Sequence, residues 1–327
     1  MFVSPAPHET WPSWPNPAAA GFDPARFARA TALAQSLGSA GLFLVRDGRP
    51  LNGLGDPAWR ANARSIRKSI LCALFGIAVA RGQVDLAATL RDLGIEDSEG
   101  LSEVERGATV ADLLAARSGI MHPAGYESDW MKTLKAPRHA HAPGTHWCYN
   151  NWDFNALGTI FERCTGRGVP DAFAEELAAP LGMEDFRPGD ATHVPSAESV
   201  HPAYPITLSA RDLARFGLLW LNRGRWGDRQ LVPADWVRAS LEPLSDAGED
   251  GAYGRLWWLS RDGTHLPGLR VPPGTYSARG WGGHHLIVVP AHDLVVVHRA
   301  QTEVEPFRIV GKPAMGRILA ALLGAVA

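Results

Sequence analysis

The sequence has little cysteine, almost no net charge and no long apolar run. Its cysteines, Cys72, Cys148 and Cys164, are odd in number and lack CxxC spacing, so a disulfide framework is not expected. The 327 residues carry a formal net charge of -2, so no basic field attracts nucleic acid or an anionic membrane. The longest apolar run, Ile70 to Ala80, is too short to cross a bilayer.

Several catalytic motifs are also missing. Without HExxH, GxSxG, GxGxxG or a Walker A motif, the sequence argues against zinc peptidases, α/β-hydrolases and nucleotide cofactors. Histidines lie close together at His139, His141 and His146, and at His284 and His285, but no acidic residue stands at ligand spacing. We therefore expect no metal and no other cofactor. Cys148, beside Tyr149, lacks the matching histidine and asparagine of a thiol enzyme and is expected to pack in the core.

The opening segment, MFVSPAPHETWPSWPNP, has neither a basic region nor an apolar stretch. This composition predicts that the chain has no signal peptide. Together with the unpaired cysteines, it favours a cytoplasmic protein without a membrane partner. The sequence carries no signal for an oligomeric state.

β-Hairpin patterns occur near both ends of the chain, with helical patterns between them. Residues 40–51 read as strand, Asp-Gly turn and strand, and residues 285–299 read as a second hairpin, followed by a closing helix over AMGRILAALLGAV. The helical patterns end at glycines and run over 69–82, 109–119, 152–166, 171–182 and 209–224.

This arrangement predicts an α/β (α+β) fold, with strands contributed by both termini. Residues 1–75 and 200–327 are expected to form one α/β domain together, and residues 76–199 an inserted, mostly helical domain. The active site is then expected in the cleft between the two.

Ser65 and Lys68 stand one helical turn apart at the start of the apolar helix, in the stretch RSIRKSILCALFGIAVARG. The buried flank would favour the neutral, basic form of Lys68, which a serine nucleophile needs. The helix N-terminus would supply backbone N–H groups for an oxyanion. The alternative is a simple helix cap with a solvated lysine.

A second candidate stretch is GTHWCYNNWDFNALG, in which Tyr149 and Asn151 form a YxN pattern where a helix begins. A phenol beside a serine and a lysine can shuttle a proton to the leaving group. Asn151 can hold the lysine or a substrate carbonyl in place. The alternatives are core packing for Tyr149 and helix capping for Asn151.

A third candidate stretch, SARGWGGHHLIVVP, places small residues before a strand, where a substrate can approach the backbone closely. A β-bulge at an edge strand is the alternative. The tryptophans of the chain are a related ambiguity, because they either line an acyl pocket or, more commonly, pack in the core; those concerned are Trp130, Trp257, Trp258 and Trp281.

In order and spacing, the three stretches resemble the serine hydrolases of the class C β-lactamase and DD-peptidase superfamily, and most closely its esterase and 6-aminohexanoate-dimer-hydrolase-like branch. The resemblance covers Phe22 to the C-terminus and is supported by LLAARSGIMHP and YNNWDFNALG. It implies that Ser65 is acylated and that Lys68 and Tyr149 relay protons. It also implies that the backbone amides of Ser65 and Trp281 form the oxyanion hole.

The resemblance places the family's third motif, Lys-Thr-Gly or His-x-Gly, on Ala278-Arg279-Gly280, with a shifted register onto Trp281-Gly282-Gly283 as the alternative. Arg279, Gly280, Gly282 and His284 are thus expected to bind substrate. The chain departs from the pattern because no lysine occurs between Lys135 and Lys312 to meet a substrate carboxylate. Arginine is not a direct replacement for lysine.

We therefore expect a serine hydrolase that cleaves a small ester or linear amide through an acyl-enzyme on Ser65. Lys68 and Tyr149 are the expected proton relay, and Asn151 the expected orienting residue. One alternative is β-lactamase or DD-peptidase activity. The other is a non-catalytic binding module on the same fold, which a large distance between Ser65 and its partners would favour.

Overall fold

The computed structural model describes residues 11–327. The first ten residues, on which the signal-peptide prediction partly depends, lie outside the described part. Trp11 and Trp14 follow them and lie along the first hairpin, where their indole N–H groups donate to the carbonyl oxygens of Gly48 and Arg46, both at 2.9 Å. Within residues 11–327, no helix is both long enough and apolar enough to cross a membrane.

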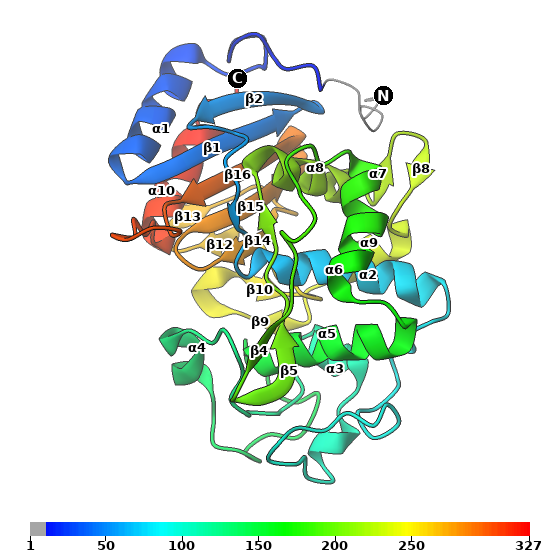
Figure 1. Ribbon diagram of the computed structural model, residues 1–327. Helices are drawn as coiled ribbons and strands as arrows, with labels where there is room; N and C mark the ends of the chain where they lie inside the picture. Colours follow the sequence, from blue (N-terminus) through cyan, green and yellow to red (C-terminus); the bar gives the residue numbers. More distant parts are fainter. Residues whose placement is uncertain (1–10) are drawn as a thin grey trace.

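An antiparallel eight-stranded sheet organises the fold, in the order β2-β1-β16-β15-β14-β11-β10-β9 (Figure 1). Its strands are β1 Ser39–Arg46, β2 Arg49–Leu54, β9 Ser245–Asp246, β10 Ala252–Tyr253, β11 Trp258–Leu259, β14 Tyr276–Gly280, β15 His284–Val289 and β16 Leu294–Ala300. In the sheet, β1 from the N-terminal part pairs with β16 from the C-terminal part. The predicted fold class and both predicted hairpins are confirmed.

The sheet is covered on both faces. Helices α1 (Pro24–Ser36) and α10 (Lys312–Leu323) pack together over one face, and α8 (Ala210–Leu221) packs over the other (Figure 1). Successive residues of β16 therefore enter different cores, with Val295 in one and Val296 in the other. Burial of both faces explains why the first four residues of this strand, Leu294–Val297, are all apolar instead of alternating with polar residues.

Helix α2 (Ile66–Ala80) is buried almost all round, as its composition predicts. It packs against α5 (Asn151–Thr165), α6 (Val169–Phe173) and α9 (Ala234–Ser240) and against the strands β14 and β15, so it lies between these helices and the sheet. Gly76 lets the indole of Trp236 approach, because a Cβ at this position would stand 2.3 Å from Trp236 Cδ1. The helix is followed by Gly82 in a left-handed turn (φ 69°).

The region between α2 and α8 contains the helices α3 Val110–Leu114, α4 Asp129–Leu134, α5 Asn151–Thr165, α6 Val169–Phe173 and α7 Ala179–Leu181, and most of its other residues lie in turns and loops. It also holds the hairpin of β4 (Val194–Ser196) and β5 (Ser199–Ala203). The sequence boundary placed after residue 75 falls inside α2, and the boundary before residue 200 falls inside β5.

The remaining elements are short: β3 Ala61–Asn62, β6 Thr207–Leu208, β7 Arg225–Trp226, β8 Arg229–Gln230, β12 Thr264–Leu266, β13 Leu269–Arg270, α9 Ala234–Ser240, the 3-10 turns Glu105–Gly107, Gly248–Asp250 and Pro290–His292, and a π-helical turn Ala174–Ala178. The pairing of β3 with β6 matters most for the site, because β3 leads directly into the segment before α2.

Candidate active site

Ser65 immediately precedes the first residue of α2, and its hydroxyl makes no capping hydrogen bond to the helix. The preceding residue, Arg64, has a left-handed backbone (φ 55°), which is uncommon for a residue with a side chain. The alternative that Ser65 is a helix cap beside a solvated lysine therefore does not describe this site.

The side chains of Ser65, Lys68 and Tyr149 meet at one point. Lys68 Nζ lies 2.6 Å from Ser65 Oγ and 3.0 Å from Tyr149 Oη. The first pair is brought together by the turn of α2, and the second by the approach of the segment that leads into α5. The three groups thus form a continuous hydrogen-bonded chain through the lysine nitrogen.

Lys68 is 1% exposed and lies between the rings of Tyr149 and Phe154, with Nζ 4.7 Å from each ring centroid. Burial lowers the pKa of this amine well below its usual value, and the neighbouring Arg67 cation lowers it further, while Glu127 acts in the opposite direction. A buried amine with a lowered pKa is neutral at a lower pH than a surface lysine, so it is able to accept a proton.

Tyr149 is buried among aromatic rings, including Phe154 at 4.9 Å and Trp258 at 5.2 Å between centroids. Burial raises the pKa of its phenol to about 12, although the Ser65 hydroxyl and Arg67 act to lower it. The phenol therefore keeps its proton at neutral pH. The opposite shifts distinguish the two partners of Ser65, with Lys68 suited to accept a proton and Tyr149 to donate one.

Arg67 is a site residue that the sequence reasoning missed. It is 2% exposed, its Nη2 donates to Asn155 Oδ1 at 2.8 Å, and its guanidinium lies 4.1 Å from the ring centroid of Tyr204. An arginine inside an otherwise apolar helix was the available signal, because a buried cation needs a specific reason to be there.

The two asparagines at the start of α5 have different tasks. Asn150 caps the helix by accepting a hydrogen bond from Asp153 N at 2.9 Å. Asn151 instead donates through Nδ2 to the carbonyl oxygens of Gly125 (3.2 Å) and Tyr126 (2.6 Å). Its Oδ1 is buried without a hydrogen-bond partner among the described residues. Asn151 thus supports the segment that leads into α4, and the predicted contact with Lys68 is not among its hydrogen bonds in residues 11–327.

Gly280, the last residue of β14, lies directly against the segment before Ser65. A Cβ at this position would stand 2.8 Å from the carbonyl oxygen of Ala63 and 2.9 Å from Arg64 Cβ. The absent side chain therefore lets the strand end reach the start of α2, and Trp281 follows at the edge of the same pocket. This close approach favours the register with Gly280, rather than Gly282, as the glycine of the third motif.

The other two residues expected to bind substrate have different positions. Arg279 lines the pocket, but its guanidinium is 7% exposed and pairs with Asp250 at 2.7 Å. His284 is not among the pocket-lining residues, and its Nε2 lies 2.7 Å from Thr302 Oγ1. The neighbouring His285, paired across the sheet with Arg279, lines the pocket instead.

The pocket above Ser65 has a volume of about 690 Å³. Its walls come from the segment leading into α4, from the turn after β14 and from the start of α10. They comprise Ser65, Arg64, Arg67, Tyr126–Met131, Tyr149, Asn151, Trp258, Arg279–Gly283, His285 and Ile309–Lys312. Of the four tryptophans considered above, Trp130, Trp258 and Trp281 line the pocket, whereas Trp257 is fully buried in the core.

Three of the cations that line this pocket pair with carboxylates. Arg64 pairs with Glu303 at 3.3 Å, and Asp250 accepts from both Arg279 and Lys312. Lys312 was not expected here, because it lies far along the chain and reaches the pocket only through the position of α10. Among the described lining residues, Arg67 is the arginine without a carboxylate partner, because its Nη2 donates to the Asn155 amide and its Nη1 is buried without a hydrogen-bond partner.

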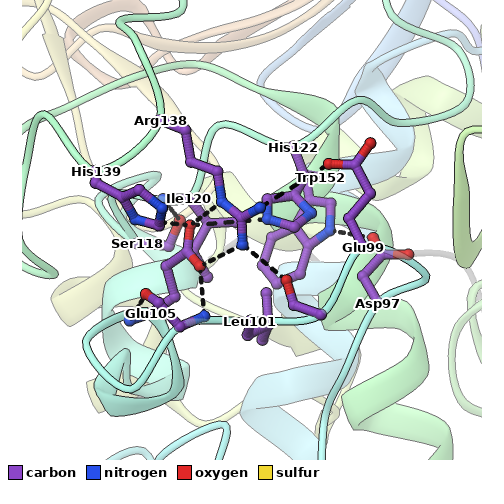
Figure 2. Close-up of polar contacts among 12 residues, drawn as sticks. Asp97, Glu99, Leu101, Glu105, Ser118, Ile120, His122, Arg138, His139 and Trp152 are labelled. Atoms are coloured by element: carbon purple, nitrogen blue, oxygen red, sulfur yellow. Dashed lines mark hydrogen bonds and ion pairs between the residues drawn. The ribbon is translucent and has the colours of Figure 1, made fainter.

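A polar cluster around the buried carboxyl group of Glu105 joins residues that flank α4 in the sequence (Figure 2). Glu105 pairs with Arg138 at 2.9 Å and lies 3.7 Å from ring nitrogens of both His122 and His139. Burial alone would raise the pKa of Glu105, but Arg138 and the Ser102 backbone lower it to about 2. The cluster ties the residues on both sides of α4 to the 3-10 turn at Glu105.

The thiols and histidines do not form a second catalytic centre in the described part of the chain. Burial raises the pKa of Cys72 and of Cys148 to about 12, so neither is a ready thiolate. No group of three metal-ligating side chains occurs within residues 11–327. The rings of His141 and His146 stack at 3.8 Å between centroids.

A model of the beta-lactamase family matches residues 26–319. The chain belongs to the beta-lactamase family. Membership in the beta-lactamase family confirms the resemblance inferred from the SxxK and YxN motifs. It also confirms the enzyme class, a serine hydrolase.

Two solved structures of beta-lactamase-type fold cover nearly the whole chain. A family VIII carboxylesterase is 17% identical, with a TM-score of 0.66 over 97% of this chain and 99% of the other. A Bacillus anthracis protein assigned provisionally as a 6-aminohexanoate-dimer hydrolase is 18% identical, with a TM-score of 0.69 over 98% of this chain and 88% of the other. At these identities the likeness shows the fold alone.

Among curated proteins, an Escherichia coli O157:H7 protein assigned provisionally as a D-alanyl-D-alanine carboxypeptidase is 23% identical over 217 residues. These residues are 53% of this chain and 49% of the relative. The chain spans about half the length of the curated relatives it matches over the longest stretches.

Proposed function

We propose that the chain hydrolyses a carboxylic ester or a linear amide through an acyl-enzyme on Ser65. The observation that carries the proposal is the position of Lys68 Nζ, buried and 2.6 Å from Ser65 Oγ. A serine hydroxyl is a weak nucleophile by itself, and an adjacent neutral amine is able to take its proton as it attacks. The short distance also counts against the non-catalytic binding module.

In the first step, Ser65 Oγ attacks the substrate carbonyl and its proton passes to Lys68. The carbonyl oxygen becomes an oxyanion, for which the backbone N–H groups of Ser65 and Trp281 are the proposed donors. Gly280 supports this assignment, because its close approach to Arg64 brings the Trp281 backbone alongside the start of α2.

In the second step, the tetrahedral intermediate collapses and the leaving group takes a proton from Tyr149. Lys68 Nζ, 3.0 Å from the phenol oxygen, then returns the proton taken from Ser65 to Tyr149. Water then attacks the acyl carbonyl and loses a proton to the same relay. The second tetrahedral intermediate collapses, the bond to Ser65 Oγ breaks, and the relay returns the proton to Ser65 Oγ as the acid leaves. Asn151 contributes by holding the wall that faces Tyr149.

The electrostatics of the pocket favour neutral substrates over β-lactams and D-alanyl peptides, which carry a carboxylate. Arg279, in the third motif, and Lys312, at the start of α10, share Asp250 as their partner. A substrate carboxylate would have to compete with that buried aspartate for them. The third motif also lacks a lysine that could meet a substrate carboxylate. Hydrolysis of an ester or a linear amide is therefore the favoured reaction.

The proposal is tested by turnover of a short p-nitrophenyl ester, a linear amide and a β-lactam by the wild type and by Ser65→Ala and Lys68→Met. We expect turnover of the ester or the amide, reduced at least about 10³-fold in both variants. Ser69→Ala is the matched control, because Ser69 lies on the same helix and donates to the Leu256 carbonyl oxygen at 2.6 Å. Undiminished turnover in both variants would exclude the mechanism.

A further inference from the structure

Large apolar side chains gather at the mouth of the pocket. Of the nine that are exposed within residues 11–327, four line the pocket, namely Tyr126, Trp130, Trp281 and Ile309. A fifth, Phe307, packs edge-on against Trp281 with 5.7 Å between ring centroids. We call these five residues the apolar rim.

The rim is formed by three separate segments that face the same pocket, one of which is the turn between β14 and β15 that carries Trp281. Tyr126 and Trp130 come from the segment that enters α4, whereas Phe307 and Ile309 come from the segment between β16 and α10. Lys312, at the start of α10, connects the segment of Ile309 to that of Trp130, because its Nζ lies 5.0 Å from the centroid of the Trp130 ring. The rim is therefore a feature of the folded pocket and not of one apolar stretch of sequence.

These side chains are exposed to an extent that needs a reason. Between 42% and 55% of each rim residue is open to solvent. Soluble proteins usually disperse exposed apolar side chains, and a concentration beside a cavity marks a binding surface. A cavity of about 690 Å³ is of the size that holds a drug-sized molecule, so it has room for more than the scissile group.

The charged side chains beside the apolar rim do not give it another role as a site for a charged group. Arg64 and Lys312, the cations beside Trp281 and Trp130, are each paired with a carboxylate. The rim can therefore bind a substrate through apolar contacts. A second protein chain would meet a hollow rather than a flat patch here, with Ser65 in its wall.

From this we infer that the substrate is a neutral ester or amide carrying a long or bulky apolar group, an alkyl chain or a ring system, that lies on the apolar rim. The inference rests on the proposed function and narrows its substrate class. The apolar group belongs either to the acyl part or to the alcohol or amine part of the substrate. The rim contacts would be similar in the two cases, and two substrate series distinguish them.

The test measures kcat/KM for p-nitrophenyl esters from acetate to octanoate, and for acetate esters of ethanol to octanol. Burial of one methylene stabilises a complex by an amount equal to about fourfold in a rate or binding constant. Because the rim is open on one side, we expect a rise of roughly two- to fourfold per methylene in one of the series. The series that rises identifies the part of the substrate that contacts the rim.

The double variant Phe307→Ser/Ile309→Ser removes two rim residues. We expect the ratio of kcat/KM between the longest and shortest esters of the rising series to fall at least about tenfold. The matched control is Val200→Ser/Leu244→Ser, which removes two exposed apolar residues that do not line the pocket, and it should keep the wild-type ratio.

The outcomes separate this inference from the proposed function. Turnover of the acetate ester with flat profiles in both series would overturn the inference alone. An unchanged ratio in the Phe307→Ser/Ile309→Ser variant would overturn it as well. A wild-type enzyme that turns over no ester of either series and no linear amide would overturn the proposed function together with the inference.

Discussion

Arg67 offers a direct test of how the site makes Lys68 basic. The two residues are neighbours on α2, both are buried, and the Arg67 cation is the second cause, after burial, of the lowered Lys68 pKa. A positive charge on a neighbouring buried side chain disfavours the protonated form of Lys68, so the Arg67 cation adds to the effect of burial. Removing the Arg67 charge should therefore raise the pKa of Lys68.

The perturbation is Arg67→Met, which keeps an unbranched side chain of similar length without the charge. Lys68 acts as a base only when neutral, so activity is lost as the pH falls through its pKa. A higher pKa moves this acid limb of the kcat/KM profile to higher pH. At neutral pH the variant is then slower, and the difference narrows as the pH rises above both pKa values.

Arg67→Lys is the control, because it keeps the charge but loses the paired contacts with Asn155 and Tyr204. Its acid limb should stay close to that of the wild type, even if its rate falls. The assay is kcat/KM for a short neutral ester from pH 5 to pH 9, with thermal unfolding to confirm that each variant is folded. A folded Arg67→Met enzyme with an unmoved acid limb would refute the electrostatic account of Lys68.

Three further predictions concern the parts around the catalytic serine. Gly280→Ala should lower kcat/KM about 10²-fold, because its Cβ would press on the Ala63 carbonyl oxygen and move β14 away from Ser65. Gly107→Ala is the control and should keep the wild-type kcat/KM, because Gly107 has open space around it. Equal activities in the two variants would count against the Trp281 oxyanion hole. Tyr149→Phe should slow a linear amide much more than a p-nitrophenyl ester, because only the amine leaving group requires a proton; equal losses would argue against its role as proton donor. Glu105→Gln should lower the free energy of unfolding at pH 7 by roughly 2–4 kcal/mol, measured by urea denaturation, since it leaves Arg138 without its buried partner. The Glu105 pKa is lowered from 4.5 to about 2, so its stabilisation is present above pH 4.5 and lost as the pH falls towards 2; Glu103→Gln, at an exposed position, should show neither effect.

Many turns and helix ends of the fold could be predicted from short stretches of sequence. The Asp47-Gly48 turn, with both residues in left-handed conformations, closes the first hairpin as its sequence predicts. Thr109 caps α3, and Gly166 ends α5 in a left-handed conformation. In contrast, strands β9, β10 and β11 were not anticipated, because two-residue strands are too short to show an alternating pattern.

The site shows the same division between local and long-range information. The contact between Ser65 and Lys68 follows from helical spacing alone. His284 and His285 are adjacent in a strand and so point to opposite faces, and only the pairing of His285 with Arg279 shows which one faces the pocket. Asp250 and Lys312 meet through the packing of distant segments, for which the sequence has no local signal.

The central claim is that Ser65 is an activated nucleophile. It is tested most directly by intact-protein mass after brief exposure to a fluorophosphonate, with the wild type, Ser65→Ala and Ser69→Ala compared side by side. We expect a single adduct on the wild type and on Ser69→Ala, and none on Ser65→Ala. An adduct that persists in Ser65→Ala, or no adduct on the folded wild-type protein, would contradict the account.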